Sequence, residues 1–179
     1  MKKIVSIYGL IAGAIVGAML LITMPLYESG VLHFENGQWL GYTTMVIALS
    51  LVFFGIKSFR DNHSGGSITF WNGLKVGLLI TLVASLIYAL SWEVSYNTMK
   101  GDFIKLMGEK QVEKMKKEGA SEASIVEARK QTDDFAVMYK NPVFRFTLTL
   151  LEIAPVGIVI SLLSAGLLRR KELLPSTSK

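Results

Sequence analysis

Residues 146–168 read FTLTLLEIAPVGIVISLLSAGLL, an apolar stretch in which Glu152 is the only charged residue. Three earlier stretches, residues 4–24, 39–56 and 76–92, carry no charge at all. The hydrocarbon core of a bilayer is about 30 Å thick, and a helix needs about 20 apolar residues to cross it. Because backbone polar groups in hydrocarbon must be satisfied within the segment, these four stretches predict four transmembrane helices.

The composition agrees with a membrane protein. Of the 179 residues, 51% are hydrophobic and only 18% are charged, whereas soluble domains are nearer a quarter charged. We therefore expect an all-α, polytopic membrane protein with a single four-span domain over residues 1–179. The first stretch is too long for the core of a secretory signal, so we interpret it as a retained anchor. The predicted spans are residues 4–24, 39–56, 72–92 and 146–168, and residues 173–179 form a polar tail that we expect to be disordered.

The basic residues indicate an orientation in the membrane. They gather before the first span, after the second and after the fourth, whereas the loop over residues 25–38 contains no Lys or Arg. The positive-inside rule then places both termini in the cytoplasm. Lys140 and Arg145 count against this orientation, because they flank the fourth span on its outer side. The basic residues that support it are Lys2, Lys3, Lys57, Arg60, Arg169, Arg170 and Lys171.

The segment between the third and fourth spans, residues 98–140, is the only sizeable polar part of the chain. A charged, amphipathic helix is predicted from Thr98 to Glu118, where Gly119 is placed to end it. Ser121 can cap a second helix, and Asn141-Pro142 ends that helix before the fourth span. We expect an extracytoplasmic helical hairpin that either lies on the membrane surface or extends spans three and four outward.

Small residues recur four positions apart in the spans, and this spacing predicts helix faces on which backbones approach closely. Two interpretations are open, a tightly packed bundle or a narrow path for a solute. The spacing also leaves open whether the contacts form within one chain or between chains. The residues of these faces are Gly9, Gly13 and Gly17 in the first span, Gly73 and Gly77 in the third, and Gly157 and Ser161 in the fourth.

Glu152 is the residue that most needs a chemical explanation. It lies about 9 Å inside the outer edge of its span, at 1.5 Å per residue, and carboxylates inside spans face the bundle interior or a wet cavity. Pro155 leaves the carbonyl of Leu151 without its helical donor, so a kink can open room nearby. Lys75 is excluded as a partner because it lies at the opposite membrane face. The candidate partners at matching depth are Tyr42, Thr43, Thr44, Ser85, Tyr88 and Ser91.

Two roles for Glu152 follow from this depth. In the first, a neutral carboxyl forms a hydrogen-bonded clip that fixes the packing of the second, third and fourth spans. In the second, the carboxyl relays a proton or cation, or contacts a polar substrate. Intramembrane ionisable residues favour function, but a proton path usually needs several such groups and no second one lies in an apolar core.

Other chemistry is weakly indicated. The chain has no cysteine, and it shows no catalytic triad, paired carboxylates or metal-binding helix motif, so we expect no enzyme activity, cofactor or metal site. His33 and His63 are predicted on opposite sides of the membrane. The net charge of +5 is typical of cytoplasmic ends rather than of nucleic-acid binding. Lys57 and Arg60 beside a glycine-containing loop could contact lipid headgroups, although a flexible turn explains that loop equally.

Several stretches, in order along the chain, resemble a bacterial membrane-protein family called domain of unknown function 4199. The resemblance implies a four-span protein with an outer helical hairpin, and with it we expect a bacterial cytoplasmic (inner) membrane as the location. It implies no activity, so no catalytic or binding residue follows from it. The stretches that carry it are residues 8–13 (YGLIAG), 41–42 (GY), 47–50 (IALS), 54–61 (FGIKSFRD), 66–70 (GSITF), 75–78 (KVGL), 141–142 (NP) and 151–157 (LEIAPVG).

Two functions remain from the sequence. The first is a structural or accessory membrane protein whose small-residue faces pack against a second copy or against another membrane protein. The alternative is a small transporter or channel component that uses Glu152 as an intramembrane proton or cation group. In both, the lipid bilayer is the expected surrounding and nucleic acid is not an expected partner.

Overall fold

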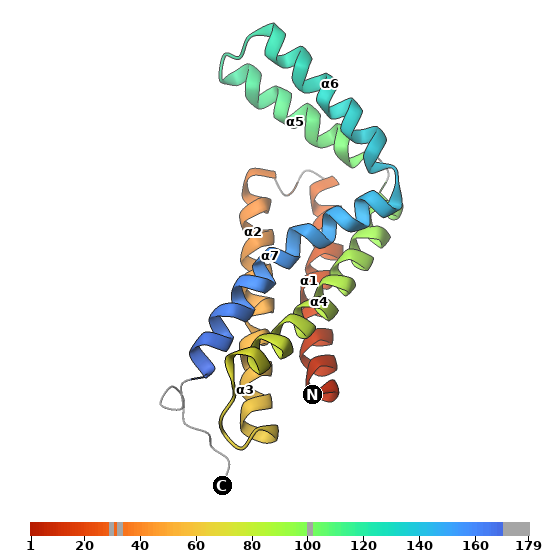
Figure 1. Ribbon diagram of the computed structural model, residues 1–179. Helices are drawn as coiled ribbons and strands as arrows, with labels where there is room; N and C mark the ends of the chain where they lie inside the picture. The colour runs from red at the N-terminus through yellow and green to blue at the C-terminus, as the bar shows by residue number, and fades with distance from the viewer. Residues whose placement is uncertain (29–30, 32–33, 100–101, 170–179) are drawn as a thin grey trace.

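The computed structural model describes residues 1–28, 31, 34–99 and 102–169 (Figure 1). The described residues form helices and contain no strand, which confirms the all-α prediction. The helices are α1 (Lys2–Glu28), α2 (Phe34–Leu49), α3 (Leu51–His63), α4 (Phe70–Thr98), α5 (Phe103–Lys117), α6 (Glu122–Tyr139) and α7 (Pro142–Leu168).

Four helical segments among the described residues are long and apolar enough to cross a membrane, as predicted. They extend beyond the predicted spans because an absence of charge marks only the part of a helix that matches hydrocarbon. At 1.5 Å per residue, the 29 residues of α4 reach about 43 Å, which matches a bilayer with its headgroup regions. The four segments are Lys2–Tyr27, Trp39–His63, Phe70–Thr98 and Pro142–Leu168.

The second span consists of two helices that follow each other nearly end to end (Figure 1). Between α2 and α3, Ser50 keeps a right-handed helical backbone, and its hydroxyl donates to the carbonyl of Ile47 at 2.6 Å. A side-chain hydroxyl that bonds to a nearby carbonyl competes with the regular helical pattern. The chain therefore crosses as one continuous rod with a local irregularity at its middle.

Helix α4 packs against α1 along one seam and against α7 along another. A methyl group built on Gly13 would lie 2.6 Å from the Ile87 side chain across the first seam. One built on Gly157 would lie 2.1 Å from the Thr81 side chain across the second. The glycines are therefore required for close approach, and the contacts that the sequence left open form within one chain.

The same relationship holds for the other small residues of the predicted faces. Gly9 lies against Val83 and Gly17 against Ser91 in the α1–α4 seam. In the α4–α7 seam, Gly73 lies against Ala165 and Gly77 against Ser161.

Helices α5 and α6 form a hairpin at the end of the bundle opposite the N-terminus (Figure 1). Gly119, with φ at +77°, follows the first helix, and Ser121 caps the second by accepting from the Ser124 amide at 3.2 Å. The first hairpin helix begins at Phe103 rather than at Thr98, because α4 itself continues to Thr98. The predicted tail, residues 173–179, lies outside the described residues.

Candidate functional site

A cavity of about 400 Å³ lies between α1, α2, α4 and α7, at the end of the bundle that carries the hairpin. Its walls are mostly aliphatic and aromatic, with a few hydroxyl groups and one carboxylate. The described residues that line it are Val16, Met19, Leu20, Thr23, Met24, Tyr27, Leu40, Gly41, Tyr42, Thr44, Met45, Tyr88, Trp92, Phe103, Met107, Tyr139, Thr149 and Glu152.

Glu152 projects from α7 into this cavity, and its side chain is exposed there. Its carboxylate accepts a hydrogen bond from the Tyr88 hydroxyl of α4 at 3.4 Å, a long distance for an O–H···O bond. The next residue, Ile153, is fully buried in the core. Consecutive helical residues point in directions about 100° apart, so the helix that buries Ile153 turns Glu152 toward the open space.

The structure brings together some of the residues predicted around Glu152. Tyr42, Thr44 and Tyr88 line the same cavity, and the Thr44 hydroxyl donates to the Leu40 carbonyl at 2.8 Å. Their depth in two different spans was sufficient to place them near the carboxylate.

The remaining predicted residues lie elsewhere. Ser85 is buried, and its hydroxyl has no hydrogen-bond partner among the described residues. Ser91 occupies the α1–α4 seam, where its hydroxyl lies against Gly17. Pro155 lies within α7, and neither it nor Thr43 is among the residues that line the cavity.

The hairpin contributes a wall of the cavity that the sequence did not indicate. Phe103 and Met107 of α5 and Tyr139 of α6 line it, and the Phe103 ring packs edge-on against Trp92, with centroids 4.9 Å apart. The opposite face of α5 packs on α6, where Gly108 lies against Thr132. The hairpin helix thus has two apolar contacts, one toward its partner helix and one toward the cavity.

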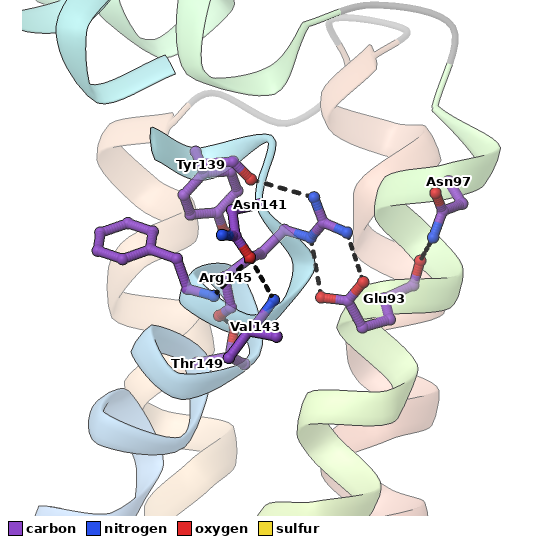
Figure 2. A network of polar contacts seen from close by, with 8 residues as sticks. Glu93, Asn97, Tyr139, Asn141, Val143, Arg145 and Thr149 are labelled. Atoms are coloured by element: carbon purple, nitrogen blue, oxygen red, sulfur yellow. Dashed lines mark hydrogen bonds and ion pairs between the residues drawn. The ribbon is translucent and has the colours of Figure 1, made fainter. Parts of the chain in front are cut away.

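A largely buried ion pair joins the ends of α4 and α7 that lie nearest the hairpin (Figure 2). The Arg145 guanidinium donates from Nε to one oxygen of Glu93 at 2.8 Å and from Nη2 to the other. A third donor, Nη1, reaches the Tyr139 carbonyl at 3.1 Å, and Arg145 is only 4% exposed. The pair therefore ties both spans to the end of the hairpin.

Aromatic rings surround this ion pair. The guanidinium carbon of Arg145 lies 3.9 Å from the centroid of the Tyr96 ring, within the range of a cation–π contact. Tyr139 packs against Tyr96, with centroids 5.6 Å apart, and burial raises the pKa of the Tyr139 phenol. The phenol consequently stays neutral at physiological pH, where it borders both the ion pair and the cavity.

The two basic residues proposed as headgroup contacts are both bonded to Asp61. Lys57 reaches one carboxylate oxygen at 2.6 Å and Arg60 the other at 2.7 Å. The Arg60 side chain is 1% exposed, so in this conformation it has no surface on which a headgroup could bind. Lys57, at 27% exposure, keeps part of its side chain at the surface.

The described part of the chain contains no group of three or more His, Cys, Asp or Glu residues that could hold a metal ion. His63 stacks on Phe59, with ring centroids 5.7 Å apart. His33 lies outside the described residues.

A family model described as a protein of unknown function, DUF4199, matches residues 7–170. The chain belongs to the DUF4199 family. This confirms the resemblance, and the match covers both packing seams, the cavity and the hairpin. Neither the curated proteins nor the solved structures give a significant match to this family member.

Proposed function

We propose that this DUF4199 protein is a small transporter or channel component in which the Glu152 carboxyl binds and releases a proton or a cation. The observation that carries the proposal is the exposure of the Glu152 side chain to a cavity of about 400 Å³. Small-molecule sites have volumes of roughly 300 to 1,000 Å³, with mostly apolar walls and a few convergent polar groups. The Glu152 cavity has these properties.

A carboxyl that only clips helices together should be enclosed and fully hydrogen-bonded, because unsatisfied polar groups are costly in a membrane protein. Among the described residues, Glu152 instead has one hydrogen bond, the long contact from Tyr88. Its side chain is otherwise exposed and lines the cavity. This arrangement supports the relay or substrate role over the clip.

A structural or accessory role is the second candidate. It is favoured by the two glycine seams, which make α1, α4 and α7 a closely packed unit. Since those seams are filled within the chain, a second copy or another membrane protein would have to bind elsewhere. We propose no enzyme activity for either role, because no second carboxylate and no Lys, Arg, His or Cys is among the described residues that line the cavity beside Glu152.

We further propose that the protein lies in a bacterial inner membrane with both termini in the cytoplasm. The N-terminus and the end of α7 lie at the same end of the bundle, away from the hairpin (Figure 1). Arg145, which counted against this orientation, is paired with Glu93. The positive-inside rule counts basic residues rather than net charge, so the proposed orientation rests on the basic residues at the termini and after the second span.

Flux measurements in liposomes test the transport role. Purified protein is reconstituted, and proton and monovalent-cation fluxes are followed with fluorescent indicators for the wild type and for Glu152→Gln. The proposal expects flux in the wild type and its loss in the variant. The matched control is Glu113→Gln, which removes a carboxylate from the exposed surface of the hairpin and should leave flux unchanged. Wild-type flux no higher than that of empty liposomes would contradict the proposal.

A further inference from the structure

The walls of the Glu152 cavity have a strong bias in charge. Of the described residues that line it, Glu152 is the only one with an acidic or basic side chain at neutral pH. Lys, Arg and His are missing from those lining residues, and Arg145, the nearest basic residue along α7, is already bonded to Glu93. An ionised Glu152 therefore gives the cavity one negative charge in otherwise uncharged surroundings.

The second property of these walls is their aromatic content. A large share of the lining side chains are aromatic, and they come from five different helices. Aromatic ring faces attract cations, most strongly where water is excluded. The aromatic lining residues are Tyr27 of α1, Tyr42 of α2, Tyr88 and Trp92 of α4, Phe103 of α5 and Tyr139 of α6.

We propose that this cavity binds a lipophilic organic monocation, a molecule with one positively charged centre and an aromatic or aliphatic body. The inference rests on the proposed role of Glu152 as a group that binds a cation, and it adds the class of molecule that the cavity binds. Glu152 balances the charge, the aromatic rings contact the cationic centre, and the methionine and leucine side chains cover the body.

Other ligand classes match the walls less well. A phosphate or carboxylate group would meet Glu152 and no basic side chain, so it would be repelled. An inorganic divalent cation needs six or more oxygen ligands, and the described residues provide no cluster of acidic side chains. A wholly apolar ligand such as an acyl chain would leave the carboxylate without a partner in a desolvated site, which is costly.

The position of the tyrosines agrees with a cation beside Glu152. Tyr88 already contacts the carboxylate, and Tyr42 and Tyr139 line the same cavity. Tyr42 is 43% exposed, so its ring is accessible. A cation that bonds to Glu152 would consequently lie within reach of aromatic rings from α2, α4 and α6.

The test compares two ions of the same shape and opposite charge. Binding of tetraphenylphosphonium and of tetraphenylborate to the detergent-solubilised full chain is measured by equilibrium dialysis. The proposal expects saturable binding of the phosphonium and none of the borate. In Glu152→Gln the phosphonium affinity should fall by about tenfold or more, because one unit charge at contact distance is removed. Glu113→Gln, outside the cavity, should bind as the wild type does.

Two further variants keep the test decisive if Glu152→Gln folds poorly. Glu152→Asp keeps the charge and should retain phosphonium binding, whereas Tyr42→Leu removes one accessible ring and should weaken it by about two- to tenfold. Equal binding of both ions, or phosphonium binding that is unchanged in Glu152→Gln, would overturn the proposal, since the cavity would then be a general apolar site. Absence of wild-type binding would overturn it too.

The outcome is independent of the flux experiment. Phosphonium binding without transport would uphold the ligand class and contradict the transport role. Glu152-dependent proton flux without phosphonium binding would uphold the transport role and contradict the ligand class.

Discussion

Arg145 and Glu93 form a bidentate ion pair that joins the ends of α7 and α4 nearest the hairpin. Breaking a buried pair by removing one partner costs roughly 3 to 5 kcal/mol, because an uncompensated charge is left behind. We expect Glu93→Gln to lower the free energy of unfolding by about 3 kcal/mol. This value is at the lower end of that range because Glu93 is 20% exposed. Unfolding titrations in mixed detergent micelles measure this.

The matched variant for the ion pair is the double substitution Glu93→Gln/Arg145→Met, which leaves no charge unpaired. It should recover a large part of the stability lost in Glu93→Gln alone. A double variant that is as unstable as the sum of its two single variants would show that the pair itself contributes little.

The α4–α7 seam predicts opposite effects for two glycines of α7. A methyl group on Gly157 would lie within 3.0 Å of the methyl, hydroxyl and Cβ atoms of Thr81, so no rotation of Thr81 relieves the clash. We expect Gly157→Ala to cost about 1 to 3 kcal/mol of stability. Gly166 has nothing within 4 Å, so Gly166→Ala should be neutral or stabilise by up to about 1 kcal/mol. Equal melting temperatures for the two variants would contradict the close packing of Gly157 against Thr81 in the α4–α7 seam.

The hairpin contact between Gly108 and Thr132 predicts a local effect. A methyl group on Gly108 would lie 2.3 Å from the Thr132 methyl carbon, so Gly108→Ala should push α5 and α6 apart. Hydrogen exchange should then speed up in the two hairpin helices and stay unchanged in α1 and α4. Adding Thr132→Ala removes the two closest atoms and should restore protection in part; exchange that rises evenly across the protein would argue against a local hairpin contact.

The hydrogen bond between Tyr88 and Glu152 separates the two roles of the carboxyl. If Glu152 mainly faces the cavity, Tyr88→Phe should cost only about 1 kcal/mol, the usual net value of one hydrogen bond. Ile153→Ala, a fully buried neighbour, should cost about 2 to 5 kcal/mol. A loss in Tyr88→Phe as large as that in Ile153→Ala, measured by thermal melting, would favour the clip.

The sequence predicted the four apolar helices well, because an apolar stretch of about 20 residues without charge is typical of a helix that crosses the hydrocarbon core of a bilayer. It also placed Tyr42, Thr44 and Tyr88 near Glu152, since depth in a span follows directly from position in the chain. Depth does not give direction around the helix axis, however. Ser91 has a suitable depth, but it points into the α1–α4 seam beside Gly17.

The hairpin side of the cavity could not be predicted in the same way. Phe103 and Met107 are four positions apart and share the apolar face of the predicted amphipathic helix, but that pattern does not say which surface the face contacts. They reach the cavity with Tyr139 because α5 and α6 fold over the end of the bundle. The pairing of Arg145 was missed for a related reason. Arg145 and Glu93 are 52 positions apart, and only the packing of α7 on α4 brings them together.

Cysteine labelling at position 152 tests most directly whether Glu152 stands in a water-accessible cavity. The chain has no cysteine, so a single introduced thiol is the only one present, and a thiol reacts rapidly only where it can ionise. Glu152→Cys, Leu151→Cys and Ile153→Cys are placed in lipid nanodiscs and treated with a charged methanethiosulfonate. Ile153 is fully buried, and Leu151 is 62% exposed on a membrane-spanning helix, where we expect its exposed surface to face lipid rather than water. We expect rapid labelling of Glu152→Cys and slow labelling of both neighbours; labelling of Glu152→Cys as slow as theirs would contradict the cavity and the function proposed for it.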